Sequence, residues 1–591
     1  MIRRAHVLLL AVACGAAIAA QQPPRDSTRP VAGTATIGGR VFIDGDAQRP
    51  ARRVRVTLTN VAKASPGLTA TTDDNGAFVF RGLPAGRFEL QAFKNAYLRA
   101  SYGASRPDRS GTPIVVKDGE TIVNLQMAIA HGGAITGVVR DGGGRPAPGL
   151  SVRVLKLGYN AVSGERTLVT PGSFNAAVTD DRGEYRAFGL PPGGYVVVVA
   201  PQVSGRGNDA IRVLTAAEVQ QALRGAAVSA PASSPVARVN YAPVFYPGTT
   251  EIGAAATIPV ALGEERAGID IAMQLVPTAT ISGIVSSPTG ALPPMLSVRL
   301  VPAGGGAEML NGAGLRGLSA LPTVDGRYAF SGVAPGSYTV RATVGTGRGA
   351  PPNTPIQWAA ADVNVSGQDL DVPLVLQPGV SVAGRVVFDG AAPTPAEIVQ
   401  MSFALVPPAS GVAPSSGGGR VDAEGKFTFA GVTPDSYRFT TTWNAPNATE
   451  RWTLKSSAAN GRDAFEAPLR VSSGDPLNWT VTFTDKPTAV AGVLKEPGGR
   501  PATDYYILVF STDRQHWTPG SRRVRMTRPA TDGSYSVKGL PAGEYFLAAP
   551  ADLESGEWND PVLLDQLVRA SARITLRDGE TTTQDFRVGG G

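Results

Sequence analysis

Cysteine and histidine are nearly absent from this sequence of 591 residues, which contains one cysteine and three histidines. The cysteine, Cys14, lies within the first 20 residues, so the rest of the chain can form no disulfide. Small exported domains often depend on disulfides for their stability. Each folded unit of this chain must instead be stable through its own hydrophobic core.

Catalytic motifs are equally scarce. Beyond residue 20 the only histidines are His131 and His516, which we interpret as solvated loop residues. A zinc peptidase site needs a His-x-x-Glu pair, but Ala134 and Pro519 occupy the third position after these two histidines. No Gly-x-Ser-x-Gly nucleophile motif and no distinctive pair of carboxylates is visible. We therefore expect no catalytic residue, no metal ion and no cofactor.

Charge is also low, because charged residues make up only 17% of the chain and the formal net charge is +7. No cluster of lysine and arginine is interleaved with aromatic residues, so we expect no binding of nucleic acid. Beyond the N-terminus no apolar run approaches the roughly 20 residues that cross a bilayer. We therefore expect no transmembrane segment.

Residues 1–20 have the pattern of a secretory signal peptide. Arg3 and Arg4 precede an apolar stretch, and Ala17-Ile18-Ala19 is a small-x-small cleavage site. This pattern predicts export, with residues 21–32 as a linker.

A second interpretation of the N-terminus is a lipobox, Ala11-Val12-Ala13-Cys14, which would place a lipid anchor on Cys14. The residue three positions before the cysteine is Ala where Leu is usual. Both interpretations predict an exported protein, either secreted or held in the periplasm or at the outer surface.

Glycine and proline are abundant, with 71 and 48 residues, together a fifth of the chain. Apolar residues make up 42%, which is enough to form real cores. A turn-rich, charge-poor chain of this kind is typical of many short strands joined by tight turns. The composition thus predicts an all-β protein.

The sequence repeats one spacing five times. Each copy has a glycine, an aromatic residue two positions later, a second glycine at +6 and a second aromatic at +12. The glycine pairs are Gly76 and Gly82, Gly183 and Gly189, Gly326 and Gly332, Gly425 and Gly431, and Gly533 and Gly539.

The spacing has a physical reading. The first glycine, often preceded by Asp as in Asp532-Gly533, predicts a hairpin turn, because glycine adopts a positive φ without steric cost. The next aromatic residue begins a strand with its ring in the core. A Gly-Leu-Pro-x-Gly segment then ends that strand, since proline lacks a backbone donor. Each copy opens earlier with an apolar-x-Gly-x-apolar strand, followed by alternating runs such as Val54-Arg55-Val56-Thr57-Leu58.

These motifs resemble the carboxypeptidase regulatory-like domain. The resemblance is best in the first, second and fifth copies, and it implies a transthyretin-like (prealbumin-like) β-sandwich, a fold often grouped with carbohydrate-binding-like folds. We therefore predict a tandem array of five seven-stranded sandwiches with two short helices in insertions. The expected units are residues 33–132, 133–278, 279–378, 379–486 and 487–591.

The second unit is longer than the others, and its excess lies within residues 202–257. Thr215-Ala216-Ala217-Glu218 forms a capping box that predicts a helix to about Leu223. A second short helix is expected after Asn559-Asp560-Pro561, where Asn or Asp caps the helix and proline takes its first position.

Loops are the expected place for function, because sandwiches present binding surfaces there. Tyr97 and Tyr102 follow strand ends, and five of the six tryptophans lie in the last two units, including Trp479 and Trp558. The alternative is that these rings cover the ends of their own sandwiches. The candidate ligand-binding aromatic residues are Tyr241, Tyr246, Trp443, Trp452 and Trp517.

Three functions remain open from the sequence. The first is a non-catalytic array that binds a glycan, a peptide or an envelope protein. The second is a structural surface spacer, or a set of accessory domains for a partner protein. The third is a hydrolase whose site the sequence does not reveal. An exposed aromatic patch would favour the first, short rigid junctions the second, and a deep pocket with convergent ionisable groups the third.

Overall fold

The computed structural model describes residues 33–588 apart from a set of internal segments. Those outside the description are 45, 62–66, 160–165, 172–176, 201–210, 213–219, 221–222, 225–237, 294, 304–317, 345–356, 407–415, 446–447, 467 and 473–476. The expected signal segment with Cys14, the linker 21–32 and nearly all of the helix expected at 215–223 therefore lie outside the described residues.

The described strands form one pair of sheets in each repeat and one small additional sheet in the second, which confirms the predicted all-β array of five sandwiches. In the first sandwich the opening strand β1 pairs with β5 in the antiparallel sense and with the closing strand β9 in the parallel sense. The first sheet comprises β1 (Ala35–Ile43), β2 (Asp46–Pro50), β5 (Ala77–Leu83) and β9 (Thr121–Ile129). The second sheet comprises β3 (Arg55–Asn60), β4 (Leu68–Thr71), β6 (Gly86–Phe93), β7 (Ala100–Ser101) and β8 (Ile114–Val116).

The second sandwich repeats this plan and adds a small third sheet. The first sheet comprises β10 (Gly133–Arg140), β14 (Glu184–Leu190), β20 (Glu265–Arg266) and β21 (Ile271–Ala272). The second comprises β11 (Ser151–Tyr159), β12 (Arg166–Val169), β13 (Ala177–Val178), β15 (Gly193–Ala200), β18 (Val244–Phe245) and β19 (Ile258–Val260). The added sheet comprises β16 (Ile211–Arg212), β17 (Arg238–Tyr241) and β22 (Leu275–Pro277).

The third and fourth sandwiches follow the same order. The third has β23 (Ala279–Ser286), β26 (Arg327–Val333), β29 (Leu370–Asp371) and β30 (Leu374–Val375) against β24 (Leu296–Pro302), β25 (Leu318–Ala320), β27 (Gly336–Val344), β28 (Gln357–Val365) and β31 (Gln377–Pro378). The fourth has β32 (Val380–Asp389), β35 (Lys426–Val432), β37 (Thr453–Ala459), β38 (Arg462–Asp463) and β40 (Leu477–Thr484) against β33 (Met401–Val406), β34 (Ser416–Arg420), β36 (Asp435–Trp443) and β39 (Leu469–Val471).

The fifth sandwich carries the predicted C-terminal helix. Its sheets are β41 (Ala489–Lys495), β44 (Ser534–Lys538), β47 (Thr581–Thr583) and β48 (Phe586–Arg587), and β42 (Ile507–Ser511), β43 (Val524–Thr527), β45 (Gly543–Ala548) and β46 (Ala572–Leu576). Helix α5 (Pro561–Leu567) begins as expected, because the Asp560 side chain accepts a hydrogen bond from the Val562 amide at 2.9 Å. The other helices within the described residues are single turns, α3 (Pro395–Ile398), α4 (Ala448–Arg451), η1 (Ile252–Ala254), η2 (Arg514–His516), η3 (Glu557–Asn559) and η4 (Val568–Ala570).

Each sandwich has its own core, and the repeated aromatic residues lie in it as predicted. The ring two positions after the first glycine is buried in every repeat. The ring at +12 is buried in four repeats and partly buried in the third, at Tyr338. The five rings at +2 are Phe78, Tyr185, Tyr328, Phe427 and Tyr535.

The turns at the repeated glycines differ from the expected hairpins. All ten glycines have a positive φ, between 71° and 82°, as the motif predicts. However, the turn at Gly76 joins β4 to β5, which belong to different sheets, so it carries the chain across the sandwich. Asp73, three residues before that glycine, caps the turn by accepting hydrogen bonds from the amides of Asn75 and Ala77 at 2.9 and 2.7 Å. Asp180 and Asp422 act in the same way in the second and fourth repeats.

A tyrosine hydroxyl at the +2 position fixes the closing strand in three repeats. Tyr185 donates to the Ile269 carbonyl at 2.7 Å, Tyr328 donates to the Val372 carbonyl at 2.6 Å, and Tyr535 donates to the Gln584 carbonyl. In these three repeats the closing strand is divided in two at that carbonyl. Where the ring belongs to phenylalanine, in the first and fourth repeats, β9 and β40 are continuous.

The glycine of the opening strand explains why this carbonyl can come so close. A Cβ atom at Gly137, Gly283 or Gly492 would overlap the same carbonyl oxygen that the tyrosine binds. Only glycine leaves room for that approach of two backbones. The apolar-x-Gly-x-apolar motif is therefore a packing requirement of the fold.

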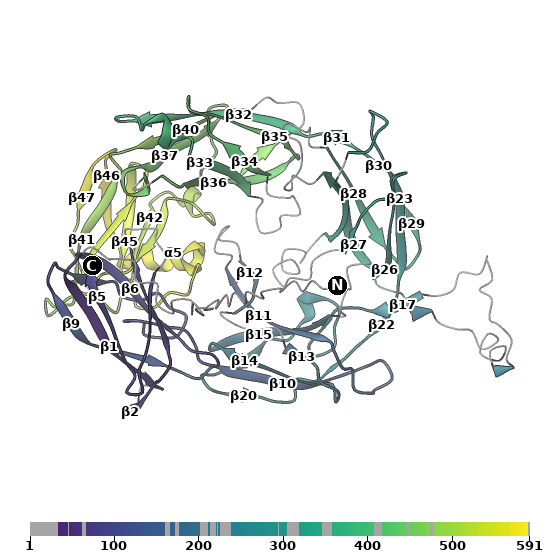
Figure 1. The fold of residues 1–591 in the computed structure, drawn as a ribbon, viewed down its shortest axis with the longest axis horizontal. Helices are drawn as coiled ribbons and strands as arrows, with labels where there is room; N and C mark the ends of the chain where they lie inside the picture. The colour runs from purple at the N-terminus through teal and green to yellow at the C-terminus, as the bar shows by residue number, and fades with distance from the viewer. Residues whose placement is uncertain are drawn as a thin grey trace, which may run out of the picture.

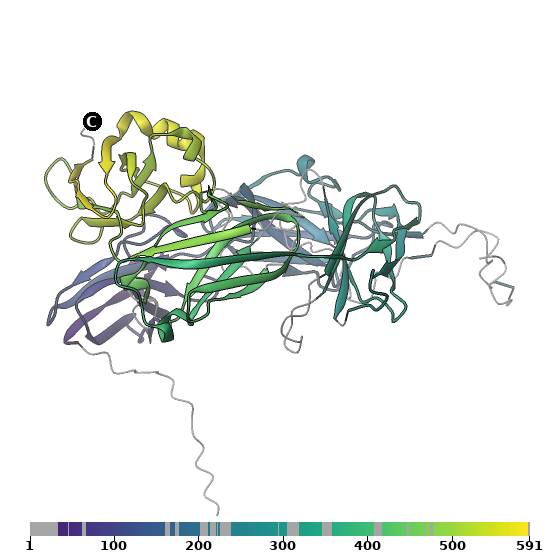
Figure 2. The same ribbon diagram turned by 90° about the horizontal axis from the view of Figure 1, so that it is seen from above.

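The five sandwiches follow a closed path, so that the last one returns to the first (Figure 1). The order around this ring is the order in the chain. Figure 2 shows that the ring is not flat, because the fifth sandwich is raised to one side of the others. The sequence repeats predict the units of this ring but contain no signal for its closure.

Candidate binding site at the junction of the first, second and fifth sandwiches

The first and fifth sandwiches meet through a set of contacts that we call the first–fifth seam, formed by Thr112, Pro113, Val115, Arg528 and Thr531. The Thr531 amide donates to the Pro113 carbonyl at 2.9 Å, and the Val115 amide donates to the Thr531 hydroxyl at 3.1 Å. Arg528, which is buried, donates to the Thr112 hydroxyl at 3.0 Å. The seam thus joins segments more than 400 residues apart in the sequence.

Arginine–carboxylate pairs extend this contact beside the seam. Arg109 of the first sandwich lies 2.7 Å from Asp552 and 3.4 Å from Glu554 of the fifth, and Arg106 lies 3.3 Å from Asp552. The pKa of Asp552 lies below its ordinary value, mainly because its carboxylate accepts a hydrogen bond from Arg109. Arg109 is only 10% exposed, so this pair is better shielded from water than an ordinary surface pair.

The fifth sandwich also touches the second. Lys156 lies 3.3 Å from Glu554, and the Tyr159 hydroxyl donates to Asp560 at 3.1 Å. Burial, followed by this hydrogen bond and the charge of Asp560, raises the pKa of Tyr159 to about 12. Three sandwiches therefore converge on one region.

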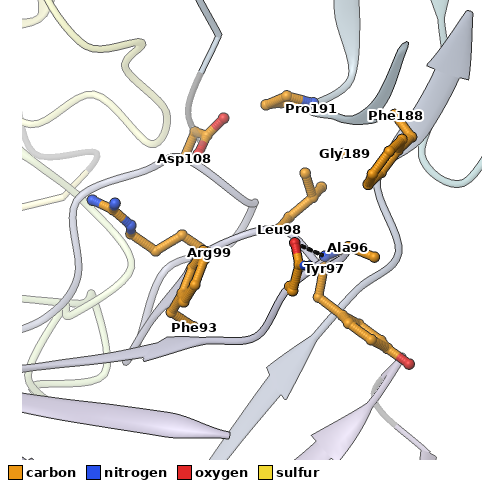
Figure 3. A pocket seen from close by; sticks show the side chains of 10 residues that line it. Phe93, Ala96, Tyr97, Leu98, Arg99, Asp108, Phe188, Gly189 and Pro191 are labelled. Carbon is orange, nitrogen blue, oxygen red and sulfur yellow. Dashed lines mark hydrogen bonds between the residues drawn. The ribbon is translucent and has the colours of Figure 1, made fainter. Parts of the chain in front are cut away.

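A cavity of about 150 Å3 lies at this junction, between the first and second sandwiches (Figure 3). The first sandwich contributes the segment after β6 and Asp108 from the loop that precedes β8. The second contributes its Gly-Leu-Pro-Pro-Gly corner. The residues that line the cavity are Phe93, Asn95, Ala96, Tyr97, Leu98, Arg99, Asp108, Phe188, Gly189 and Pro191.

The cavity combines apolar walls with a few polar groups. Phe188 is 42% exposed and stands on the second-sandwich side, while Asp108 stands across the opening (Figure 3). Asp108 has a left-handed backbone with φ of 60°. Desolvation raises the pKa of its carboxyl, and the nearby cations Lys156, Arg99 and Arg109 act in the opposite direction. Such a site suits one ring or one side chain with a polar substituent, because larger ligands need more volume.

Tyr97, one of the expected loop aromatics, lies at the rim of this cavity. Its ring points away from Asp108 in Figure 3 and packs against His131, with ring centroids 4.2 Å apart and the ring planes tilted by 40°. His131 in turn lies 3.3 Å from an Asp44 carboxylate oxygen, and the Lys94 ammonium lies 5.4 Å from the centre of the Tyr97 ring. His131 thus supports the wall of the cavity from behind, a role that its place in the sequence does not indicate.

The tryptophans expected to bind a ligand are buried, which corrects that interpretation. Trp443, Trp452 and Trp517 are 9%, 5% and 6% exposed. Trp443 and Trp452 pack in the fourth core around Phe388, and the Trp517 indole donates to the Ser511 carbonyl at 2.7 Å. The alternative, that these rings cover their own sandwiches, agrees with this packing.

The expected tyrosines of the second unit are only partly accessible. Tyr241 and Tyr246 pack against the second core, and neither lines the cavity. Tyr102 packs against the first core in the same way.

Across the described part of the chain, no group of three or more His, Cys, Asp or Glu residues could hold a metal ion. No helix within the described segments is long and apolar enough to span a membrane.

One signal in the sequence could have found Phe188. It lies five residues after the first glycine of its repeat, on the outward face of β14. The other repeats have Arg81, Ser331, Ala430 and Lys538 at this position. An aromatic residue at a position that is otherwise polar or small indicates a surface that differs from those of its sister units.

Comparison with known proteins supports the family of the first unit. Residues 36–128 match the model of the carboxypeptidase regulatory-like domain, which confirms the predicted resemblance for the first sandwich. No curated protein matches the chain.

Several solved structures of repeat proteins are similar in part. The TIE protein of Bacillus anthracis is 12% identical with a TM-score of 0.15, and the match covers 73% of this chain and 65% of that one, slightly under two thirds of its length. The minor pilin GBS52 of Streptococcus agalactiae is 14% identical with a TM-score of 0.20, over 42% of this chain and 97% of that one. Two B repeat units of the collagen-binding protein of Staphylococcus aureus are 11% identical with a TM-score of 0.13, over 72% and 94%. At these values the likenesses identify no function.

Proposed function

We propose that this chain is an exported, non-catalytic binding protein of the cell envelope, and that the cavity between its first and second sandwiches holds one group of a glycan or peptide. The observation that carries the proposal is the pairing of an exposed ring, Phe188, with the Asp108 carboxylate across a small cavity. An aromatic face packs on the apolar face of a sugar or on a side chain, and a carboxylate accepts from its hydroxyl or amide groups.

The electrostatics of the site favour an uncharged group. Asp108 is surrounded by Lys156, Arg99 and Arg109, and Glu554 lies among these cations. The charges nearly cancel, so the cavity does not select a strongly charged ligand. A sugar ring with its hydroxyl groups meets this requirement, and so does a neutral polar side chain.

A glycan array and retention on purified cell-wall polysaccharide would test this proposal with the mature chain. We expect Phe188→Ala to lower the affinity about tenfold, the equivalent of about 1.4 kcal/mol. Leu321→Ala is the control, because Leu321 is also an exposed apolar residue, 81% exposed, and it lies on the third sandwich, away from the cavity. Equal retention of both variants, or no retention of the unaltered chain on any fraction, would contradict the proposal.

A second candidate is a structural spacer, and the junctions between sandwiches favour it. Only the residues between Ile129 and Gly133 separate the first two sandwiches, and β22 is separated from β23 by Thr278 alone. Short connections of this kind hold neighbouring units in a fixed orientation. Scattering in solution that fits one rigid shape, together with no binding in the assays above, would favour the spacer.

A further inference from the structure

We propose that closure of the ring at the first–fifth seam positions the loop 103–113, so that ring closure and occupation of the cavity are linked equilibria. The part that concerns a ligand rests on the function proposed above. The part that concerns the loop rests on the contacts of the fifth sandwich alone.

The loop that carries Asp108 is held mainly from the fifth sandwich. Arg528 donates to the Gly103 carbonyl at 3.0 Å at the start of the loop and to the Thr112 hydroxyl at 3.0 Å at its end. Between these points Arg109, next to Asp108, donates to Asp552 at 2.7 Å. The fifth sandwich thus contacts the loop at both ends and beside its cavity residue.

The same loop faces the second sandwich across the cavity. Asp108 lies opposite the corner that contains Gly189 and Pro191 (Figure 3). Asp108 has a φ of 60°, a left-handed conformation that aspartate adopts more readily than most residues do. The seam contacts and the Arg109–Asp552 pair fix residues on both sides of Asp108 and so set the position of its carboxyl.

The seam is held by polar contacts and not by a shared hydrophobic core, so the first and fifth sandwiches can move apart there. None of the described hydrophobic clusters contains residues of both sandwiches, since one is built from residues 35–129 and the clusters of the fifth from residues 490–586 and 508–564. Interfaces between domains that are polar in this way permit relative motion. When the seam opens, water can replace the Gly103 and Thr112 partners of Arg528, whereas the Thr503 carbonyl of its own sandwich remains bonded to it.

These contacts have a thermodynamic consequence. If the closed ring holds Asp108 in the geometry that a ligand uses, the ligand binds the closed state more tightly and favours closure. Conversely, a change that opens the seam lowers the affinity of the cavity, although the changed residue lies in the fifth sandwich.

Hydrogen exchange of individual amides tests the structural part without a ligand. The amides of Val115 and Thr531 report on the seam, and the Thr112 amide, which donates to the Tyr102 carbonyl at 2.6 Å, reports on the loop. Asp552→Asn and, separately, Arg528→Gln should speed exchange at all three amides by about tenfold. Asp565→Asn is the matched control, because Asp565 pairs with Arg514 in the same sandwich away from the seam, and it should change none of them.

Three results would overturn the inference. In the first, the seam amides exchange faster but the Thr112 amide does not, so that the loop is independent of the seam. In the second, neither variant changes the seam amides, so that these side chains do not hold the ring. In the third, Asp552→Asn opens the seam but leaves retention on the polysaccharide unchanged. A chain that binds no polysaccharide would refute the proposed function, yet the exchange measurement would still decide whether the loop depends on the seam.

Discussion

The bond between Tyr328 and the closing strand allows a quantitative test of the fold. The Tyr328 ring is 4% exposed, and its hydroxyl donates to the Val372 carbonyl at 2.6 Å. Tyr328→Phe removes one atom and leaves that buried carbonyl without its partner. The cost of an unsatisfied buried acceptor is about 1–3 kcal/mol.

The same sandwich offers a matched control. The Tyr338 hydroxyl donates to the Ala334 carbonyl at 3.0 Å, but its ring is only partly buried. Water can replace this bond, so Tyr338→Phe should cost about 0.5–1.5 kcal/mol. The two variants change the same group in the same unit and differ mainly in burial.

Hydrogen exchange at the Val372 amide, which donates to the Ser282 carbonyl at 2.7 Å, measures the local stability of the closing strand at the Tyr328 bond. The Tyr338 bond lies elsewhere in the sandwich, at Ala334, so Tyr338→Phe should change this exchange less than Tyr328→Phe does. Tyr328→Phe should speed this exchange about five- to 150-fold, since about 1.4 kcal/mol corresponds to a factor of ten. No change, or an effect equal to that of Tyr338→Phe, would refute the reasoning that the hydroxyl fixes the closing strand.

Two further predictions concern backbone packing and alkaline pH. Gly492→Ala should unfold or strongly destabilise the fifth sandwich in a urea titration, because the added Cβ overlaps the Gln584 carbonyl. The control is Gly144→Ala, where no atom lies within 4 Å of the added Cβ; it should lower the free energy of unfolding by only about 1 kcal/mol, because Gly144 has a positive φ. Burial raises the pKa of Tyr545 to about 12, so its neutral form contributes stability that is complete below pH of about 10 and is lost as the pH rises toward 12. Thermal unfolding at pH 8, 10 and 12 should show this loss, and Tyr545→Phe should reduce it; an equal loss in that variant would contradict the assignment.

The sequence predicts the sandwiches well because their determinants are local. Glycine at a positive φ, an aromatic residue two positions later and a proline after the strand act within a few residues, so Gly76 and Phe78 suffice to locate a corner and a core ring. The assignment of that corner as a hairpin was wrong, because the sheet to which a strand belongs depends on partners far away in the chain.

The candidate site could be predicted much less well, because its residues are brought together by contacts between segments that are far apart in the sequence. A tryptophan in a loop segment has the same local pattern whether it faces solvent or, like Trp443, fills a core. The cavity combines Asp108 with Phe188, and the seam combines Thr112 with Arg528; neither pair has any local spacing that connects its members. Contacts of this kind arise from the orientation of whole domains.

The parallel pairing of β1 with β9 brings the first and last strands of a unit side by side in the same direction. The chain therefore enters each sandwich at one end and leaves at the other, and successive units must continue the path. Each junction then turns that path by some angle, and the sum of the turns decides whether the two ends of the array meet. Loss or gain of one middle unit would leave the remaining cores intact and yet separate Arg528 from Thr112, so the number of copies is itself a determinant of structure.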